Sequence, residues 1–308
     1  MQDVGENLVR NIINLQLLDR VLIVTDKKKI KIGKMIYDAA RKINLESILI
    51  VMEPRNRDGE EPPASVSAAM KEADVIIAPT EYSLTHTKAV KEARKNGARV
   101  FSMPGIDEFS LTKGGLTADY SVIQKNVEKM FSIVNNSSAV EVESKNGTKL
   151  KFSVEKRKWE KDDGIVKPGE VGNLPAGEIF VAPVENSANG KIVFDHIELA
   201  KGKLELTLEN GEVKEMKGDK EKLQRIFDEL GYKARIIAEF GIGCNNKSKI
   251  IGNTLEDEKV YGTVHIAFGN NTGFGGMNEV QFHQDGVIDE PTVTVDRRLI
   301  MRNGKWLI

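Results

Sequence analysis

The chain has 308 residues, of which 40% are hydrophobic and 30% charged, and this composition is typical of a globular protein with a sizeable core. Its 45 basic and 46 acidic residues leave a net charge of -1, so no basic excess points to nucleic acid or to an anionic membrane surface. A single cysteine, Cys244, excludes an internal disulfide framework, and no segment resembles a signal peptide or the roughly 18-residue apolar stretch of a membrane span, so we expect a cytoplasmic protein.

Short apolar runs alternate with helical segments along the first part of the chain. Helical spacing of apolar residues is expected from Val4 to Leu18, and then at 32–43, 64–72, 85–96 and 117–134. The apolar runs stand at 21–24, 48–51, 75–78 and 98–103. Buried parallel strands joined by helical crossovers have this pattern. Residues 1–135 are therefore predicted to form a doubly wound, Rossmann-like α/β domain.

The hydrophobic period becomes that of strands in the second part of the chain. Alternating apolar residues flank the turn dipeptides Asn146-Gly147 and Asn210-Gly211, as in hairpins. A short helix is expected at 219–230, and the chain closes with a strand at 292–295 and a hairpin turned at Asn303-Gly304. Residues 136–308 are therefore predicted to form a strand-rich α+β domain.

The α/β domain carries no recognised phosphate-binding motif. Its first apolar run is followed by Asp26 and then by Lys27, Lys28 and Lys29, without a glycine-rich loop. Three consecutive lysines could hold a phosphate, although a solvated loop explains them more simply.

Imidazole and carboxylate side chains gather in the second domain. His283 and Asp285 are two residues apart in the segment 280–286, which we interpret as a strand end entering a turn. On an extended chain both side chains point to the same face and can approach one divalent ion. A hydrogen-bonded pair without a metal is the alternative interpretation.

Three further residues join this pair. His265 lies in the middle of an apolar strand, Glu239 lies in another, and Glu178 follows a turn shaped by proline and glycine. Buried groups of this kind need a hydrogen-bond partner, a charge partner or a metal. A hydrogen-bonded core histidine remains the alternative for His265. Taken together, the five residues predict a divalent-metal site.

The remaining polar residues of this domain have simpler interpretations. Glu256 and Asp257 could approach the site, although a solvated loop is the default for such a charged segment. Cys244 could be a soft ligand or a small buried side chain, and His196 is interpreted as a surface or structural residue.

Four segments between residues 170 and 290 resemble, in chain order, motifs of the M29 metallo-aminopeptidases, the relatives of aminopeptidases T and S. They read NLPAGEIFVAP, AEFGIGCN, GTVHIAFG and FHQD. The resemblance implies two divalent ions (zinc, cobalt or manganese) held by Glu178, Glu239, His265, His283 and Asp285, with Glu239 bridging the two. It also implies that Glu239 and Glu178 are catalytic, that a metal-activated water attacks the N-terminal peptide bond of a peptide, and that the protein is a homodimer.

The chain departs from the M29 pattern at Thr272, where the family has a tyrosine seven residues after the histidine of the third motif. The same segments are also similar to the 2,5-dihydroxypyridine dioxygenases, and that resemblance implies a single Fe(II) held by His265, His283 and Asp285, with a small-molecule substrate. A third alternative is a metal-binding homologue without catalytic activity.

Overall fold

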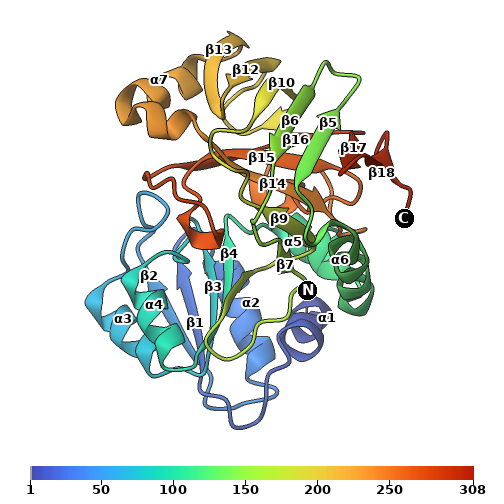
Figure 1. Ribbon diagram of the computed structural model, residues 1–308. Coiled ribbons are helices and arrows are strands. Elements are labelled where there is room, and N and C mark those ends of the chain that lie inside the picture. Colours follow the sequence, from blue (N-terminus) through green and yellow to red (C-terminus); the bar gives the residue numbers. More distant parts are fainter. Residues whose placement is uncertain (1) are drawn as a thin grey trace. The chain divides into compact units, whose positions relative to one another are not determined.

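The computed structural model describes residues 2–308, and the chain divides into two compact units (Figure 1). Unit 1 comprises Met1–Val122 and Asp162–Ala176, and unit 2 comprises Ile123–Lys161 and Gly177–Ile308. The chain passes from unit 1 to unit 2 within helix α6 (Tyr120–Val134) and later returns once to unit 1. The domain boundary at residue 135 stays a prediction.

A five-stranded parallel sheet forms the centre of unit 1, in the order β2-β1-β3-β4-β8. Its strands are β1 (Val21–Asp26), β2 (Ile48–Met52), β3 (Val75–Thr80), β4 (Arg99–Pro104) and β8 (Val171–Asn173). The apolar runs become strands because a parallel sheet that is covered on both faces buries its central strands, here β1 and β3, whereas the edge strand β2 stays partly exposed. The predicted doubly wound α/β fold is confirmed.

Helices cover both faces of this sheet. Helix α2 (Ile30–Ala40) lies on the face that carries Thr25, where Gly33 leaves no Cβ to overlap with the threonine side chain. On the opposite face, Leu22 and Val24 join a core with helices α3 (Ala64–Lys71) and α4 (Lys88–Lys95).

The first helix is shorter than the sequence pattern predicts. Helix α1 (Gln2–Asn7) continues as a π-helical turn, η1 (Leu8–Ile12), and stops there. Asn14 adopts a left-handed backbone conformation (φ 54°), and Arg99 Nη1 donates a hydrogen bond of 2.7 Å to the Ile13 carbonyl. The expected helix to Leu18 is therefore wrong, and Leu18 is 90% exposed.

Unit 2 contains an eight-stranded sheet in the order β13-β12-β10-β6-β5-β17-β18-β19, which we call sheet B. Its strands are β5 (Ala139–Glu143), β6 (Lys149–Ser153), β10 (Asn189–Phe194), β12 (Leu204–Glu209), β13 (Glu212–Gly218), β17 (Thr292–Val295), β18 (Arg298–Arg302) and β19 (Lys305–Trp306). The hairpins predicted at Asn146-Gly147, Asn210-Gly211 and Asn303-Gly304 are the connections β5–β6, β12–β13 and β18–β19. The predicted strand-rich second half is confirmed.

A second, six-stranded sheet has the order β11-β16-β15-β14-β9-β7, and we call it sheet C. Its strands alternate along the chain with those of sheet B. Its strands are β7 (Glu160–Asp162), β9 (Glu178–Val181), β11 (His196–Ile197), β14 (Ile237–Gly243), β15 (Val264–Gly269) and β16 (His283–Ile288). Phe240 packs from one face of sheet C against Phe152 and Trp159, with ring centroids 5.2 and 6.1 Å away. This aromatic contact leaves the opposite face free for polar side chains.

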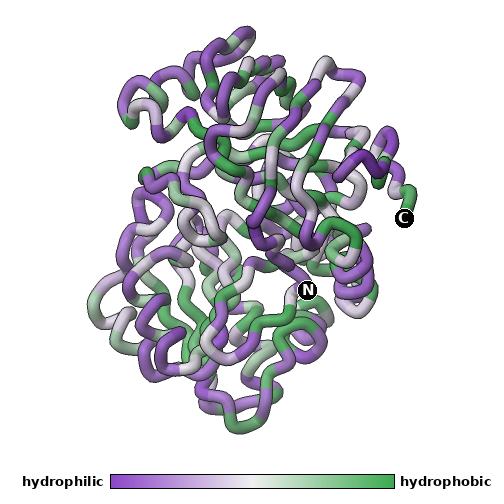
Figure 2. Tube along the Cα trace, viewed as in Figure 1, coloured by the Kyte–Doolittle hydropathy of each residue, from purple (hydrophilic) through white to green (hydrophobic). Residues whose placement is uncertain are grey.

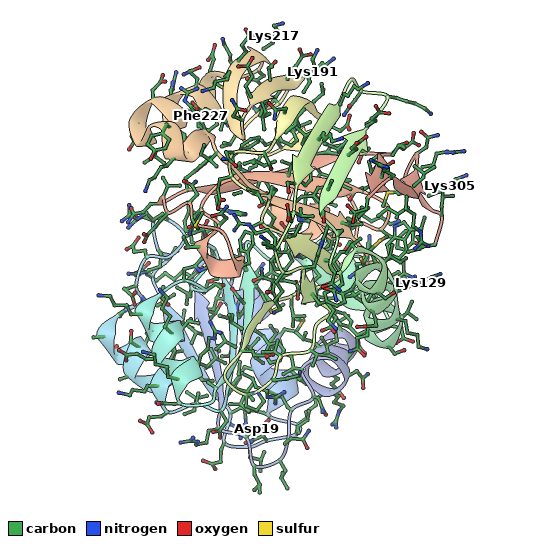
Figure 3. The ribbon with its side chains drawn as sticks, viewed as in Figure 1. Asp19, Lys129, Lys191, Lys217, Phe227 and Lys305 are labelled. Atoms are coloured by element: carbon green, nitrogen blue, oxygen red, sulfur yellow. The ribbon has the colours of Figure 1, made fainter. Side chains whose placement is uncertain are left out.

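Short helices complete the chain: α5 (Glu108–Thr112), η2 (Gly115–Thr117), α7 (Glu221–Leu230), η3 (Tyr232–Arg235), α8 (Thr254–Asp257) and η4 (Thr272–Phe274). Hydrophobic residues concentrate along the strands of each unit, whereas hydrophilic residues dominate the loops (Figure 2). Charged side chains such as Lys191, Lys217 and Lys305 reach outward from unit 2 (Figure 3). Within residues 2–308, no helix has both the length and the apolar character needed to cross a membrane.

Candidate metal centre

One face of sheet C brings all five predicted site residues together. Asp285 on β16 lies beside Ala267 on β15, and Ala267 lies beside Glu239 on β14. In the same ladder His265 lies beside Gly241, and Gly243 lies beside Glu178. Because side chains two apart on a strand share a face, these four strands present their imidazoles and carboxylates to one region.

A β-bulge in β14 aims Glu239 at this face. Ile237 pairs with Phe268, but Glu239 pairs with the very next residue, Ala267, so Ala238 is an extra residue in the ladder. Strict alternation would place Ile237 and Glu239 on the same face. With the bulge, the isoleucine joins the apolar face and the carboxylate joins the site, a use that bulges often have next to functional sites.

Glycine at position 241 makes room for an imidazole. A Cβ on Gly241 would overlap with the ring of His265, which lies across the β14 backbone. The ring nitrogen Nε2 thereby comes within 3.2 Å of Glu178 Oε2 and 3.5 Å of Glu239 Oε1. The glycine therefore allows a histidine from one strand to reach carboxylates on the two neighbouring strands.

Two groups of three potential ligands share Glu239. In the chain from residue 2 to 308, the groups able to hold an ion are Glu178–Glu239–His265 and Glu239–His283–Asp285, with ligand atoms within 4.8 Å of one another. His283 Nε2 lies 3.3 Å from Glu239 Oε2 and 3.4 Å from Asp285 Oδ2. The predicted same-face pair His283 and Asp285 is confirmed by this geometry.

The orientation of His283 is fixed from outside the group. Its Nδ1 lies 2.8 Å from the carbonyl oxygen of Asn270, so Nδ1 donates and Nε2 is left facing the carboxylates. Metal-binding histidines are commonly held in this way.

Several atoms of the centre are buried without a hydrogen-bond partner. Among the described residues these include Glu178 Oε2, Asp285 Oδ1 and both ring nitrogens of His265. Buried polar groups are otherwise almost always satisfied. The close contacts around His265 lack hydrogen-bond geometry, whereas a shared cation would satisfy imidazole and carboxylate together. The donor set therefore fits a divalent ion such as zinc, cobalt, manganese or iron.

When no cation is bound, protons on these side chains balance part of the buried negative charge. Burial acts against a charged His265, but the carboxylates of Glu178 and Glu239 raise its pKa to about 9. Burial likewise acts against a charged Glu239, but the two imidazoles lower its pKa to about 2. Burial raises the pKa of Glu178 to about 8, against the opposing effect of Lys259. A metal ion would displace these protons, so we expect its binding to release them.

The strand boundary differs from the sequence-based interpretation at His283 and agrees with it at Glu178. His283 begins β16, so the expected strand end in the segment 280–286 is wrong. Glu178 is the first residue of β9, directly after the turn shaped by proline and glycine, as expected.

Sequence reasoning missed two charged residues of the centre. The Lys259 side chain is fully buried and forms ion pairs with Glu178 and, at 2.7 Å, with Glu258. The expectation of a solvated loop here is wrong, because Glu256 and Asp257 are also buried, at 0% and 4% exposure. A run of four charged residues between Leu255 and Val260 is the only sequence signal, and on its own it is typical of a surface.

Other candidates stay outside the two ligand groups. Cys244 is fully buried and contacts the carbonyl of Ile242, as expected of a small core side chain. His196 pairs with Asp289 at 2.7 Å. In unit 1, Lys28 pairs with Glu81 at 2.8 Å.

A scan against family models matches residues 14–308 to the family described as "NicX: 2,5-dihydroxypyridine 5,6-dioxygenase". The chain belongs to this family. Among curated proteins no significant match is found.

Two solved structures have the same fold as this chain. A 2,5-dihydroxypyridine dioxygenase from Pseudomonas putida KT2440 is 16% identical, with a TM-score of 0.81 and coverage of 99% of this chain and 96% of that chain. AmpT from Thermus thermophilus is 18% identical, with a TM-score of 0.71 and coverage of 100% and 98%. The expected relatedness to the 2,5-dihydroxypyridine dioxygenases is thus supported, the fold is shared with AmpT, and membership of the M29 family stays a prediction.

Proposed function

We propose that this protein is a metal-dependent aminopeptidase that uses two divalent ions. The observation that carries the proposal is the position of Glu239 between two three-residue ligand groups. One oxygen of its carboxylate faces His265 and the other faces His283, at 3.5 and 3.3 Å. A carboxylate with one oxygen on each side is suited to bridging an ion pair, and paired ions are typical of hydrolases, including aminopeptidases.

In this proposal Glu178 and His265 would hold one ion and His283 and Asp285 the other, and Glu239 would serve both. Bound ions of this kind lower the pKa of a water molecule and polarise a scissile carbonyl. The low pKa of Glu239, about 2, keeps its carboxylate charged at neutral pH, so it can serve both ions without first losing a proton. The carbonyl of Asn270 keeps His283 Nε2 turned toward Glu239 and Asp285, where the second ion would bind.

Space for a substrate opens next to the centre. A cavity of about 590 Å³ is lined by Asp285 together with residues such as Asp257, Thr254 and His196. A volume of this order accommodates a small molecule or the end of a peptide.

The second candidate is a mononuclear iron dioxygenase, favoured by the family match over residues 14–308. Thr272, where M29 aminopeptidases carry a tyrosine, points the same way. In this alternative His265, His283 and Asp285 hold one Fe(II), and Glu178 and Glu239 are free to act on the substrate. The geometry is less favourable to it, because in the described residues His265 is grouped with the two glutamates and not with His283 and Asp285.

Metal counting combined with two assays distinguishes these functions. The purified protein is stripped of metal, reloaded in turn with Zn²⁺, Co²⁺, Mn²⁺ and anaerobic Fe²⁺, and analysed for ions per chain by mass spectrometry. Each form is tested for release of amino acids from anilides and short peptides, and for oxygen consumption with 2,5-dihydroxypyridine. About two ions per chain together with hydrolysis supports the peptidase. One iron with oxygen consumption supports the dioxygenase, and binding without any turnover supports a non-catalytic homologue.

Replacement of the bridging residue gives a sharper test. Glu239→Gln should reduce the ion count below two and reduce hydrolysis to background, because a neutral amide is a poor bridge between two cations. Glu141→Gln is the matched control, since Glu141 forms only an exposed pair with Lys151. Hydrolysis retained by Glu239→Gln would contradict the bridging role.

A further inference from the structure

Lys259 is a fully buried cation at the edge of the candidate metal centre. Its ammonium group contacts two carboxylates, Glu178 through Oε1 and Glu258 through Oε1 at 2.7 Å. Removing an ammonium group from water costs free energy unless the charge is paired. Here the two carboxylates offset that desolvation cost. Such a residue needs an explanation beyond packing.

The two oxygens of Glu178 have different partners. Oε1 is bound by Lys259, whereas Oε2 has no hydrogen-bond partner and lies 3.2 Å from His265 Nε2. A carboxylate that rotates freely would not keep one oxygen turned to the imidazole. The ammonium therefore selects which oxygen faces the Glu178–Glu239–His265 group.

Lys259 is itself held in place. Its backbone carbonyl accepts a hydrogen bond of 2.8 Å from the amide of Asn245, and its backbone amide donates to the Glu256 carbonyl at 3.2 Å. Glu258 also binds the ammonium, at 2.7 Å, and is itself only partly exposed. These contacts fix the position of the ammonium group that binds Glu178.

We propose that Lys259 is a positioning residue that orients the Glu178 carboxylate for the ion of the Glu178–Glu239–His265 group. The inference rests on the proposed two-ion centre and assigns to this lysine a role outside the ligand set. Residues that orient a metal ligand in this way commonly contribute on the order of 10–100-fold to metal affinity.

A purely electrostatic role would have the opposite consequence. The positive charge of Lys259 repels a divalent ion, so its removal should tighten binding if charge alone mattered. If orientation matters more, its removal should weaken binding at one group and leave the other unchanged. The sign of the change therefore separates the two roles.

The experiment measures Co²⁺ binding to the metal-free protein by titration calorimetry, with ions per chain determined by mass spectrometry. Wild-type protein is compared with Lys259→Met, which keeps the length of the side chain and removes the charge. Glu178→Gln and Asp285→Asn identify the binding step that belongs to each group. Lys259→Met should weaken the same step as Glu178→Gln, on the order of 10–100-fold, and leave the step lost in Asp285→Asn unchanged.

A double variant keeps the test valid if the single variant does not fold. Lys259→Met with Glu178→Gln removes both charges together, so neither is left buried alone, and such paired replacements are usually tolerated. If Lys259 acts through Glu178, the double variant should bind Co²⁺ as Glu178→Gln alone does. Lys29→Met, in unit 1 and paired with Glu81 at 3.4 Å, is the control and should bind as wild type does.

Two results would overturn the inference: unchanged or tighter binding by Lys259→Met, or a double variant that differs from Glu178→Gln. The proposed function fails separately, through the wild-type stoichiometry. Wild-type protein that binds a single ion contradicts the two-ion centre whatever the lysine variant does, because the inference is judged by the ratio of variant to wild-type affinity.

Discussion

At the scale of single residues, the side chains that meet on sheet C could be predicted as candidate ligands, but their charged neighbour could not. His283 and Asp285 are recognisable because they are two apart on an extended segment, and Glu239 and His265 because they interrupt apolar strands. Lys259 gives no such signal. It lies 81 positions from Glu178 in the chain, within a charged run that resembles a solvated surface, and only the folded sheet brings the two together.

Gly241→Ala tests how the centre is packed. The added methyl group would overlap with the His265 ring, so the imidazole must move away from Glu178 and Glu239. We expect a loss of about 1–3 kcal/mol in the free energy of unfolding, typical of overpacking, measured by urea denaturation of the metal-free protein. Metal affinity should fall as well, because His265 is displaced.

The matched control is Gly202→Ala, at an exposed position where a Cβ would meet Asp219 at an ordinary contact distance of 3.6 Å. It should leave both stability and metal affinity nearly unchanged. Wild-type affinity in Gly241→Ala would show that the His265 ring does not need this space.

At the scale of elements, regular alternation was predictable but its interruptions were not. The parallel strands of unit 1 and the hairpins of unit 2 follow from apolar runs and turn dipeptides. The bulge at Ala238 leaves no mark in the sequence, since Ile237 and Glu239 alternate as though they shared a face. Its position depends on pairing with β15, which is a property of the sheet and not of the segment.

The segment 270–278, which precedes β16, is anchored by Glu185. This carboxylate accepts hydrogen bonds from Asn271 Nδ2 at 3.2 Å and from the Met277 amide at 2.7 Å, and it pairs with Arg157. Burial would raise the pKa of Glu185, but the Met277 amide and Arg157 lower it below its usual range, so the carboxylate is charged at neutral pH. The anchor thereby supports Asn270, the hydrogen-bond partner of His283.

Glu185→Gln should loosen this segment and affect one ligand group selectively. We expect a loss of about 1.5–3 kcal/mol in unfolding free energy, because hydrogen bonds to a charged group are replaced by weaker ones. Co²⁺ binding to the Glu239–His283–Asp285 group should weaken, since His283 loses part of its support, while the group with His265 is retained. Glu141→Gln again serves as control, and equal weakening at both groups would contradict the anchoring role.

At the scale of the whole molecule, the change in hydrophobic period near residue 135 predicted two kinds of architecture, and both are present. What the period could not show is that the chain re-enters unit 1 at Asp162–Ala176 and adds β8 beside β4, because a strand of three residues has no measurable period. The expected homodimer stays a prediction.

All five candidate ligands belong to unit 2, so we expect the effect of metal on stability to be confined there. An ion that binds only the folded state at 100 times its dissociation constant adds about 2.7 kcal/mol to stability. Hydrogen exchange measured by mass spectrometry with Zn²⁺ and then with a chelator should therefore slow, on the order of 100-fold, for amides of β9, β14, β15 and β16 that exchange by unfolding of unit 2. Strands β1 and β3 carry no ligand and should exchange equally in both conditions. Equal protection of both units would mean that they unfold together, and no protection at all would contradict a metal site on sheet C.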